Sequence, residues 1–191
     1  MIGVLVSGEG TNLQALLDAG LPVVAVASNV PAAKALDRAA RAGVEAAVFP
    51  LDEYADRDAR DAAMADWLRA QGAQLVVCAG YMQLLRSTFL ERFPERIVNV
   101  HPAPLPEFPG ARPLEDVLAA GAPEAAATVH FVDEGADTGP VIAVEPVPVL
   151  PGDTVESLRE RVHAAEHRLL PKVVRELCAR GEASVAPTRE P

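Results

Sequence analysis

Two side chains suited to acyl-transfer chemistry, Asn99 and His101, lie two residues apart at the end of the apolar run 97–101. In an extended strand, residues two apart point to the same face, so the amide and the imidazole project together. An asparagine amide can donate to a developing oxyanion, and a histidine can hold or move a proton near neutral pH. Taken alone, the pair also fits a simpler interpretation, in which Asn99 caps a turn and His101 is a hydrogen-bonded core histidine.

The loop after His101 is rich in proline, with five prolines between positions 102 and 113. Each proline fixes its own φ angle and favours an extended conformation for the residue before it. We therefore expect a stiff loop beside the imidazole.

A glycine-rich turn, residues 7–12, follows the first apolar run. Backbone N–H groups at a helix start bind anions, and Thr11 and Asn12 add side-chain donors. The turn lacks the Gly-Lys-Ser/Thr of a nucleoside triphosphate loop, and Leu13 replaces the third glycine of a dinucleotide fingerprint, which counts against a nicotinamide-binding oxidoreductase. The pattern favours a site for one phosphate monoester, with an ordinary capped turn as the alternative.

Three carboxylates lie in the glycine-rich loop 133–140, between two predicted strands. One of them, Asp137, could orient or charge His101, as an acid commonly does for a catalytic imidazole. Acidic turns are also common as purely structural features, so the loop alone leaves both interpretations open. On the preceding strand, His130 fits a hydrogen-bonded core histidine better than a residue of the site.

The segment 163–167 has the pattern H-x-x-E-H, in which two histidines one helical turn apart bind zinc and the glutamate acts as a base. Few residues follow His167 that could supply a third ligand. We therefore interpret this segment as a partly exposed face of a helix. A zinc metalloprotease acting through His163, Glu166 and His167 stays a remote alternative.

The elements that must position these residues alternate between short apolar runs and helical patterns. We expect strands at 2–6, 23–27, 44–49, 75–79 and 97–101, with helices at 12–19, 32–42 and 57–70 between them. Fully apolar strands separated by helices indicate a parallel sheet covered on both faces. The carboxyl ends of such strands share one rim, so segments 7–10, 80–82 and 99–101 should converge there.

The second half of the chain predicts a short helix at 114–120, a strand at 127–132 and a further strand at 141–145 that Pro146 ends. A capping pair, Asp153 and Glu156, then opens a long helix that reaches about residue 179 and is kinked near Pro171. The fold class is therefore α/β, a single domain over residues 1–182 with a flexible tail at 183–191.

Composition restricts the class of protein. The chain has 191 residues, of which 50% are hydrophobic but only 4% aromatic, so one core of Ala, Val and Leu is expected. The formal net charge of −10 would repel nucleic acids and anionic membranes. The spacing of the two cysteines is not typical of a metal site or of a disulfide framework. No apolar run approaches the length of a membrane-spanning helix, and together these features favour a cytoplasmic location.

Several motifs occur together, in order, along nearly the whole chain. They are Ser-Gly-x-Gly-Thr-Asn-Leu-Gln from position 7, Ala-Gly-Tyr-Met from 79, Asn-Val-His-Pro from 99, Leu-Pro from 105, Phe-Pro-Gly from 108, Thr-Val-His-Phe-Val from 128 and Asp-Thr-Gly-Pro-Val-Ile from 137. In this combination the chain resembles the phosphoribosylglycinamide formyltransferase family, which performs folate-dependent formyl transfer in purine synthesis. The resemblance implies a mostly parallel, twisted, Rossmann-like sheet with helices on both faces and a long C-terminal helix.

The resemblance also implies a catalytic trio, which falls on Asn99, His101 and Asp137. In this hypothesis the glycinamide amine attacks the formyl carbon of 10-formyltetrahydrofolate, and Asn99 and His101 stabilise the tetrahedral oxyanion. Asp137 would raise the basicity of His101 and help to relay a proton. A carboxylate near an imidazole favours its charged form, which makes this division of roles physically coherent.

The binding residues implied by the resemblance form two groups. The nucleotide substrate would contact Gly10, Thr11, Asn12, His163 and Glu166, with Glu166 on the ribose hydroxyls and His163 near the phosphate. The folate would contact Arg57, Met82, Gln83, Leu84, Leu85, Asp133, Glu134, Gly135 and Ala136. Departures from the family pattern occur at Gln83, which is often an arginine, at Glu107, and at the pair 103–104.

The expected partners are small molecules, with 10-formyltetrahydrofolate as co-substrate, no metal, and no nucleic acid or membrane partner. The expected assembly is a monomer or a homodimer. The alternatives within the class are a formyltetrahydrofolate hydrolase and a formyltransferase acting on another amine, such as methionyl-tRNA. Those relatives carry additional domains for which we expect no room in this chain.

Overall fold

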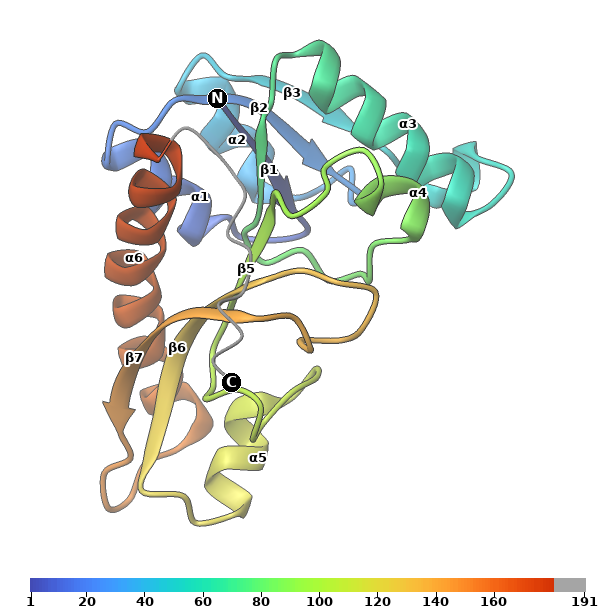
Figure 1. The fold of residues 1–191 in the computed structure, drawn as a ribbon. Helices are drawn as coiled ribbons and strands as arrows, with labels where there is room; N and C mark the ends of the chain where they lie inside the picture. The colour runs from blue at the N-terminus through green and yellow to red at the C-terminus, as the bar shows by residue number, and fades with distance from the viewer. Residues whose placement is uncertain (181–191) are drawn as a thin grey trace, which may run out of the picture.

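A seven-stranded sheet forms the centre of the computed structural model, which describes residues 1–180, in the order β3-β2-β1-β4-β5-β6-β7 (Figure 1). The strands are β1 (Ile2–Val6), β2 (Val23–Ser28), β3 (Glu45–Val48), β4 (Leu75–Cys78), β5 (Ile97–His101), β6 (Glu124–Phe131) and β7 (Val141–Pro148). The first five are parallel, whereas β6 is antiparallel to β5 and β7 to β6. The predicted mostly parallel sheet is confirmed.

Helices cover both faces of the sheet, as expected from its apolar strands. One face packs against α1 (Thr11–Asp18), α2 (Lys34–Arg41), α5 (Pro113–Ala119) and α6 (Val155–Ala179). The other packs against α3 (Arg57–Ala70) and the short α4 (Ser87–Leu90). A short 3-10 turn, η1 (Leu51–Glu53), follows β3. The turn η1 and helix α4 have no counterpart in the sequence-based expectations. No helix of residues 1–180 is both long enough and apolar enough to span a membrane.

Alternation along β5 places the two polar side chains. Val98 and Val100 belong to the core on the α6 side, and Ile97 belongs to the core on the α3 side. Asn99 and His101 therefore face the α3 side, at the strand end, as the period of two predicts. Antiparallel pairing sets His130 of β6 directly opposite Asn99.

Two expectations about the second half were wrong. Strand β7 does not end at Pro146, which pairs with Ala126, but continues to Pro148. Proline is tolerated there because β7 is the last strand of the sheet, so its outer edge needs no N–H donor.

Helix α6 is not capped by Asp153 and Glu156. Thr154 is the N-cap and forms a reciprocal capping box with Ser157. Asp153 instead accepts hydrogen bonds from the Leu150 amide at 2.7 Å and the Ser157 hydroxyl at 2.8 Å, and it pairs with Arg161. The helix runs through Pro171 without a break. The expected boundary at residue 182 and the tail 183–191 lie outside the described residues.

Candidate active site

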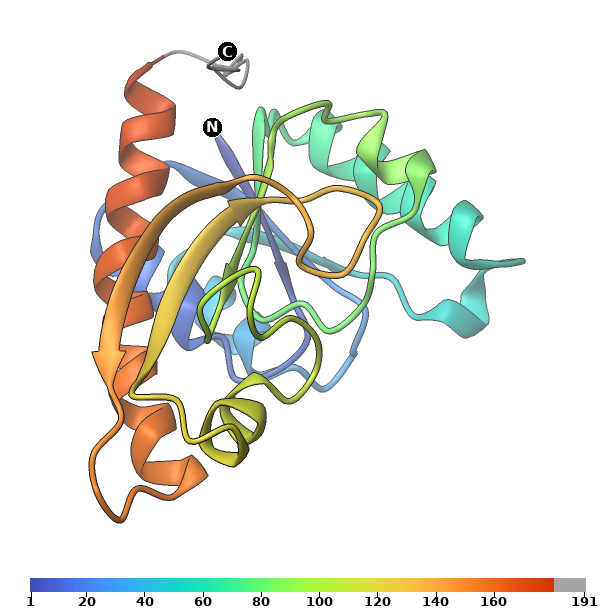
Figure 2. The same cartoon turned by 60° about the horizontal axis from the view of Figure 1, so that its bottom comes forward.

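The strand ends converge at one rim, as the parallel topology predicts. The Ser7 hydroxyl donates to Asn29 Oδ1 at 2.7 Å and accepts from the Met82 amide at 2.9 Å. This side chain links the turn after β1 to the segments after β2 and β4. From the other side of the rim, the loop between β6 and β7 extends towards the segment that follows β4 (Figure 2).

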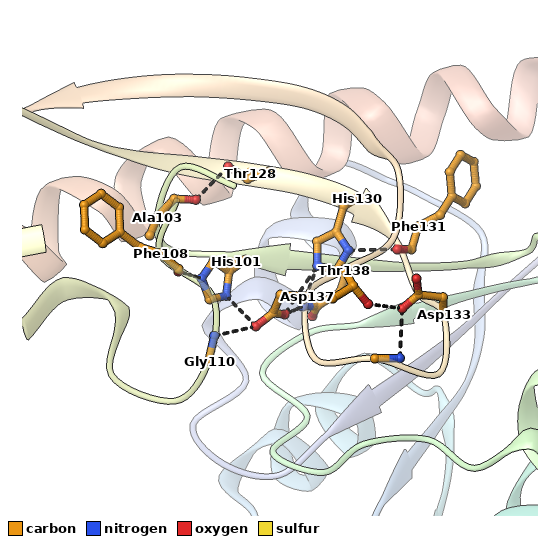
Figure 3. A network of polar contacts seen from close by, with 12 residues as sticks. His101, Ala103, Phe108, Gly110, Thr128, His130, Phe131, Asp133, Asp137 and Thr138 are labelled. Carbon is orange, nitrogen blue, oxygen red and sulfur yellow. Dashed lines mark hydrogen bonds and ion pairs between the residues drawn. The ribbon is translucent and has the colours of Figure 1, made fainter. Parts of the chain in front are cut away.

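His101 is buried and makes two polar contacts (Figure 3). Its Nε2 lies 2.7 Å from the Phe108 carbonyl oxygen, which can only accept, so Nε2 carries a proton. Its Nδ1 lies 3.4 Å from Asp137 Oδ2. Burial lowers the pKa of His101, while the Phe108 carbonyl and the Asp137 charge oppose this effect. At neutral pH the ring is therefore mostly neutral, with an Nδ1 lone pair available to accept a proton beside a carboxylate.

Asp137 is held in a left-handed backbone conformation, with a φ of 56°. Its Oδ2 accepts from the Gly110 amide at 3.0 Å, so the proline-rich loop and the β6–β7 loop meet at this carboxylate (Figure 3). Burial by itself would raise the pKa of Asp137, but the contacts with His130, Gly110 and His101 together lower it. The carboxylate is therefore charged at neutral pH.

Asn99 and His130 complete the polar cluster. Asn99 Nδ2 lies 3.2 Å from His130 Nε2 and 3.4 Å from Asp137 Oδ1. His130 Nδ1 lies 2.8 Å from the Phe131 carbonyl oxygen and donates to it, and His130 Nε2 lies 3.5 Å from Asp137 Oδ1. His130 is 2% exposed, as a core histidine would be, yet it also lies in the site. Both interpretations of His130, as a hydrogen-bonded core histidine and as a residue near the site, therefore apply, and the register of β6 against β5 that combines them could not be inferred from the sequence.

The loop that carries Asp137 is folded by its own polar groups. Asp133 Oδ1 accepts from the Gly135 amide at 3.0 Å and from the Thr138 hydroxyl at 2.6 Å (Figure 3). A side chain at Gly139 would meet the Phe131 carbonyl oxygen at 1.9 Å, so only glycine fits where the loop returns to the sheet.

A cavity of about 370 Å³ opens beside the trio, within the range of small-molecule sites. Its lining includes Asn99, His101 and Asp137 together with seven of the predicted folate residues, Met82, Gln83, Leu84, Leu85, Asp133, Gly135 and Ala136. The two other predicted folate residues lie outside this lining. Arg57 donates through Nη2 to the Leu84 carbonyl oxygen at 2.8 Å, and Glu134 is exposed on the same loop.

A second cavity of about 280 Å³ is lined by all five predicted substrate residues, Gly10, Thr11, Asn12, His163 and Glu166. The two cavities share Gly80, Met82, Val100 and Pro102, so they adjoin at the end of β5. Helix α1 begins at Thr11, which places its N-terminal amides and their partial positive charge at this second cavity. The arrangement can hold an anionic substrate next to the trio.

Glu166 points into the second cavity. Its Oε2 accepts from Asn12 Nδ2 at 2.9 Å, and burial raises its pKa to about 7 although the hydrogen bond opposes the shift. The neighbouring His163 and His167 rings are stacked with their centroids 6.3 Å apart. Among residues 1–180, no three His, Cys, Asp or Glu side chains are grouped to hold a metal ion. Glu166 of the H-x-x-E-H pattern therefore bonds the side-chain amide of Asn12 in the turn after β1.

Glu166→Gln is expected to stabilise the protein above neutral pH. Between about pH 4.5 and 7 the folded protein keeps a proton that the unfolded chain releases, so this carboxyl makes stability fall as pH rises through that window. In the variant, the glutamine side chain does not titrate, so this decrease in stability with pH is absent. The glutamine oxygen can still accept a hydrogen bond from Asn12. We expect the variant's free energy of unfolding to exceed that of the wild type by about 3 kcal/mol at about pH 8.

Urea unfolding of both proteins at about pH 5 and about pH 8 measures this difference. A gap between variant and wild type that stays the same at both pH values would contradict the raised pKa.

The chain is similar to known formyl transferases. A family model described as formyl transferase matches residues 1–174. Phosphoribosylglycinamide formyltransferase of Mycobacterium tuberculosis is 44% identical over 97% of this chain and 88% of its own length. The crystal structure of glycinamide ribonucleotide transformylase 1 from Symbiobacterium toebii superimposes with a TM-score of 0.93 at 47% identity, covering 97% of this chain and 90% of that one.

A longer relative also matches. The trifunctional purine biosynthetic protein adenosine-3 of Drosophila melanogaster is 41% identical over 97% of this chain, but the chain spans only 14% of that protein's length. The similarity therefore concerns one part of the trifunctional protein.

Proposed function

The chain belongs to the formyl transferase family, and we propose that it transfers the formyl group of 10-formyltetrahydrofolate to the amine of 5′-phosphoribosylglycinamide in purine biosynthesis. One observation carries the proposal: Asp137 contacts both Asn99 and His101 beside a cavity that adjoins a second cavity at the N-terminus of α1. The arrangement provides one compartment for the folate and one for the phosphorylated amine.

In the proposed reaction, the amine nitrogen attacks the formyl carbon, and the carbonyl oxygen becomes an oxyanion. Asn99 Nδ2 carries two hydrogens, and because its contact with Asp137 is long, one of them can turn to the oxyanion. The bond from the carbon to folate N10 then breaks, and N10 takes up the proton that the attacking amine loses. The products are the formylated amide and tetrahydrofolate.

His101 and Asp137 would handle that proton. The neutral ring of His101 can accept it at Nδ1, next to the charged Asp137. The resulting imidazolium is stabilised by the carboxylate 3.4 Å away and places a positive charge near the oxyanion. The Phe108 carbonyl and the Gly110 amide keep the imidazole and the carboxylate in place.

The second cavity suits the nucleotide. In the proposed mode the phosphate lies against the turn of Gly10, Thr11 and Asn12, with His163 nearby. Glu166 accepts from the ribose hydroxyls. This assignment gives a metal-free role to the glutamate of the H-x-x-E-H pattern.

Asn12→Ala is expected to raise KM for phosphoribosylglycinamide by about tenfold or more, because a hydrogen bond to a charged group is lost. We expect KM for the folate and kcat to change much less. Gln14→Ala, on the same helix, removes an amide that bonds Asp18 and Arg38 outside the cavity and serves as the matched control. An unchanged KM for the ribonucleotide in Asn12→Ala would place the phosphate elsewhere.

Acceptor specificity tests the function itself. We expect purified protein to deformylate 10-formyltetrahydrofolate when phosphoribosylglycinamide is present, and to do so far more slowly with glycinamide lacking the phosphate or with methionyl-tRNA. Release of formate without any amine would instead favour the hydrolase alternative. The cytoplasmic location and the monomeric or homodimeric state stay predictions.

A further inference from the structure

The segment between β4 and α4 contributes Met82, Gln83, Leu84 and Leu85 to the larger cavity but contains no helix or strand. Two of these side chains are strongly exposed, Met82 at 75% and Leu84 at 51%. We call residues 82–86 the cavity loop. Because the cavity loop lacks the regular backbone hydrogen bonds of a helix or strand, its shape depends on contacts with neighbouring elements.

The first two turns of α3 supply those contacts. Arg60 Nη1 donates to Gln83 Oε1 at 2.9 Å, and Asp61 Oδ2 accepts from the Arg86 amide at 2.9 Å. Together with the bond from Arg57 to the Leu84 carbonyl, three residues of α3 hold three positions of the cavity loop.

Arg60 and Asp61 form a salt bridge with relative side-chain exposures of only 1% and 0%. Asp61 Oδ1 accepts from Arg60 Nε at 3.0 Å and from Nη2 at 2.7 Å. Removing two charges from water costs free energy, and apolar residues of similar size are often as stable. Core residues of the same helix, such as Met64 and Leu68, pack against this side of the sheet with apolar side chains.

The pair cannot be explained as a link between distant elements, because its two members are adjacent in one helix. Their remaining polar bonds both reach the cavity loop: one at its second residue, the other at its last. The guanidinium holds a side chain, the carboxylate holds the backbone, and the two hydrogen bonds between them fix the orientation of each.

We propose that Arg60 and Asp61 are positioning residues that set the shape of the cavity loop for folate binding. This proposal rests on the proposed function. It assigns them no contact with the folate; they act through Gln83 and through the backbone at Arg86. Loss of the pair should therefore affect the folate far more than the nucleotide, because Gln83, Leu84 and Leu85 line the first cavity alone, whereas the second cavity shares Met82 with it.

Asp61→Asn tests the proposal. The amide cannot accept from both Arg60 and Arg86 as the carboxylate does, because one of its two oxygens is replaced by a donor. We expect KM for 10-formyltetrahydrofolate to rise by at least about tenfold, with KM for phosphoribosylglycinamide and kcat within about threefold of the wild type. Titration calorimetry with tetrahydrofolate should show the same weakening in Kd, independently of turnover.

A double variant, Arg60→Met with Asp61→Leu, covers the case in which Asp61→Asn does not fold. Apolar side chains of similar volume remove both buried charges together, so the protein should remain folded. The polar bonds to the cavity loop are lost, so folate should still bind at least about tenfold more weakly. Asp66→Asn is the matched control, because it removes an acid of the same helix that pairs with Arg92, a residue outside the cavity loop, and this variant should bind folate normally.

The outcomes separate the two proposals. If the wild type transfers the formyl group but the double variant keeps wild-type KM and Kd for the folate, the pair is not a positioning device and only this inference is overturned. Equal losses for folate and nucleotide would also overturn it. If the wild type neither transfers a formyl group nor binds tetrahydrofolate, the proposed function fails, and this inference fails with it.

Discussion

Asp137→Asn is expected to lower kcat by about 10²- to 10⁴-fold, the range typical of a lost proton-transfer partner. Asparagine has nearly the same shape and tolerates the left-handed φ of 56°, and its side-chain oxygen can still accept from the Gly110 amide. The substitution therefore removes mainly the negative charge beside His101. We expect the free energy of unfolding to change by no more than about 1 kcal/mol.

The pH profile of the variant gives a second measurement. In the proposed mechanism the neutral form of His101 accepts the proton, so kcat/KM should fall as pH drops through the pKa of His101. The charge of Asp137 raises that pKa, and its removal should lower it further. The acidic limb of the profile should therefore move to lower pH in Asp137→Asn.

Glu124→Gln removes an exposed charge at the far end of β6 and controls for net charge. Near-normal turnover in Asp137→Asn, or an acidic limb that does not move, would remove this carboxylate from the mechanism.

His101→Ala is expected to lower kcat by a similar factor of about 10² to 10⁴. The imidazole lies between the Phe108 carbonyl and Asp137, so its loss removes both the proton acceptor and the partner of the carboxylate. Because the two residues act as a unit, the double variant with Asp137→Asn should be hardly slower than either single variant. Steady-state kinetics of the three variants measures this directly. If the decrease in kcat of the double variant equals the product of the two single decreases, the residues act independently.

Much of the fold was predictable because it depends on local pattern. The strand 97–101 and the helix 57–70 were predicted with the bounds that the structure has, since an apolar run and an amphipathic period are properties of the segment itself. The predicted capping pair of α6 was wrong because Thr154 and Asp153 are adjacent and both residue types are good N-caps.

The site was predictable only where chemistry and topology agreed. Strand ends of a parallel sheet meet at one rim, so the convergence of the turn after β1 with the end of β5 followed from the topology. His130 joins the cluster through the register of an antiparallel pair, and Asp61 reaches the cavity loop through a bond between residues 25 positions apart. Such tertiary pairings leave no local signal in the chain.

The most direct test of the proposed function follows a carbon-labelled formyl group from 10-formyltetrahydrofolate in the presence of unlabelled phosphoribosylglycinamide. The proposed mechanism predicts that the label appears on the glycinamide amine in an amount equal to the tetrahydrofolate formed. Label recovered as formate in solution, or retained on the folate, would contradict it.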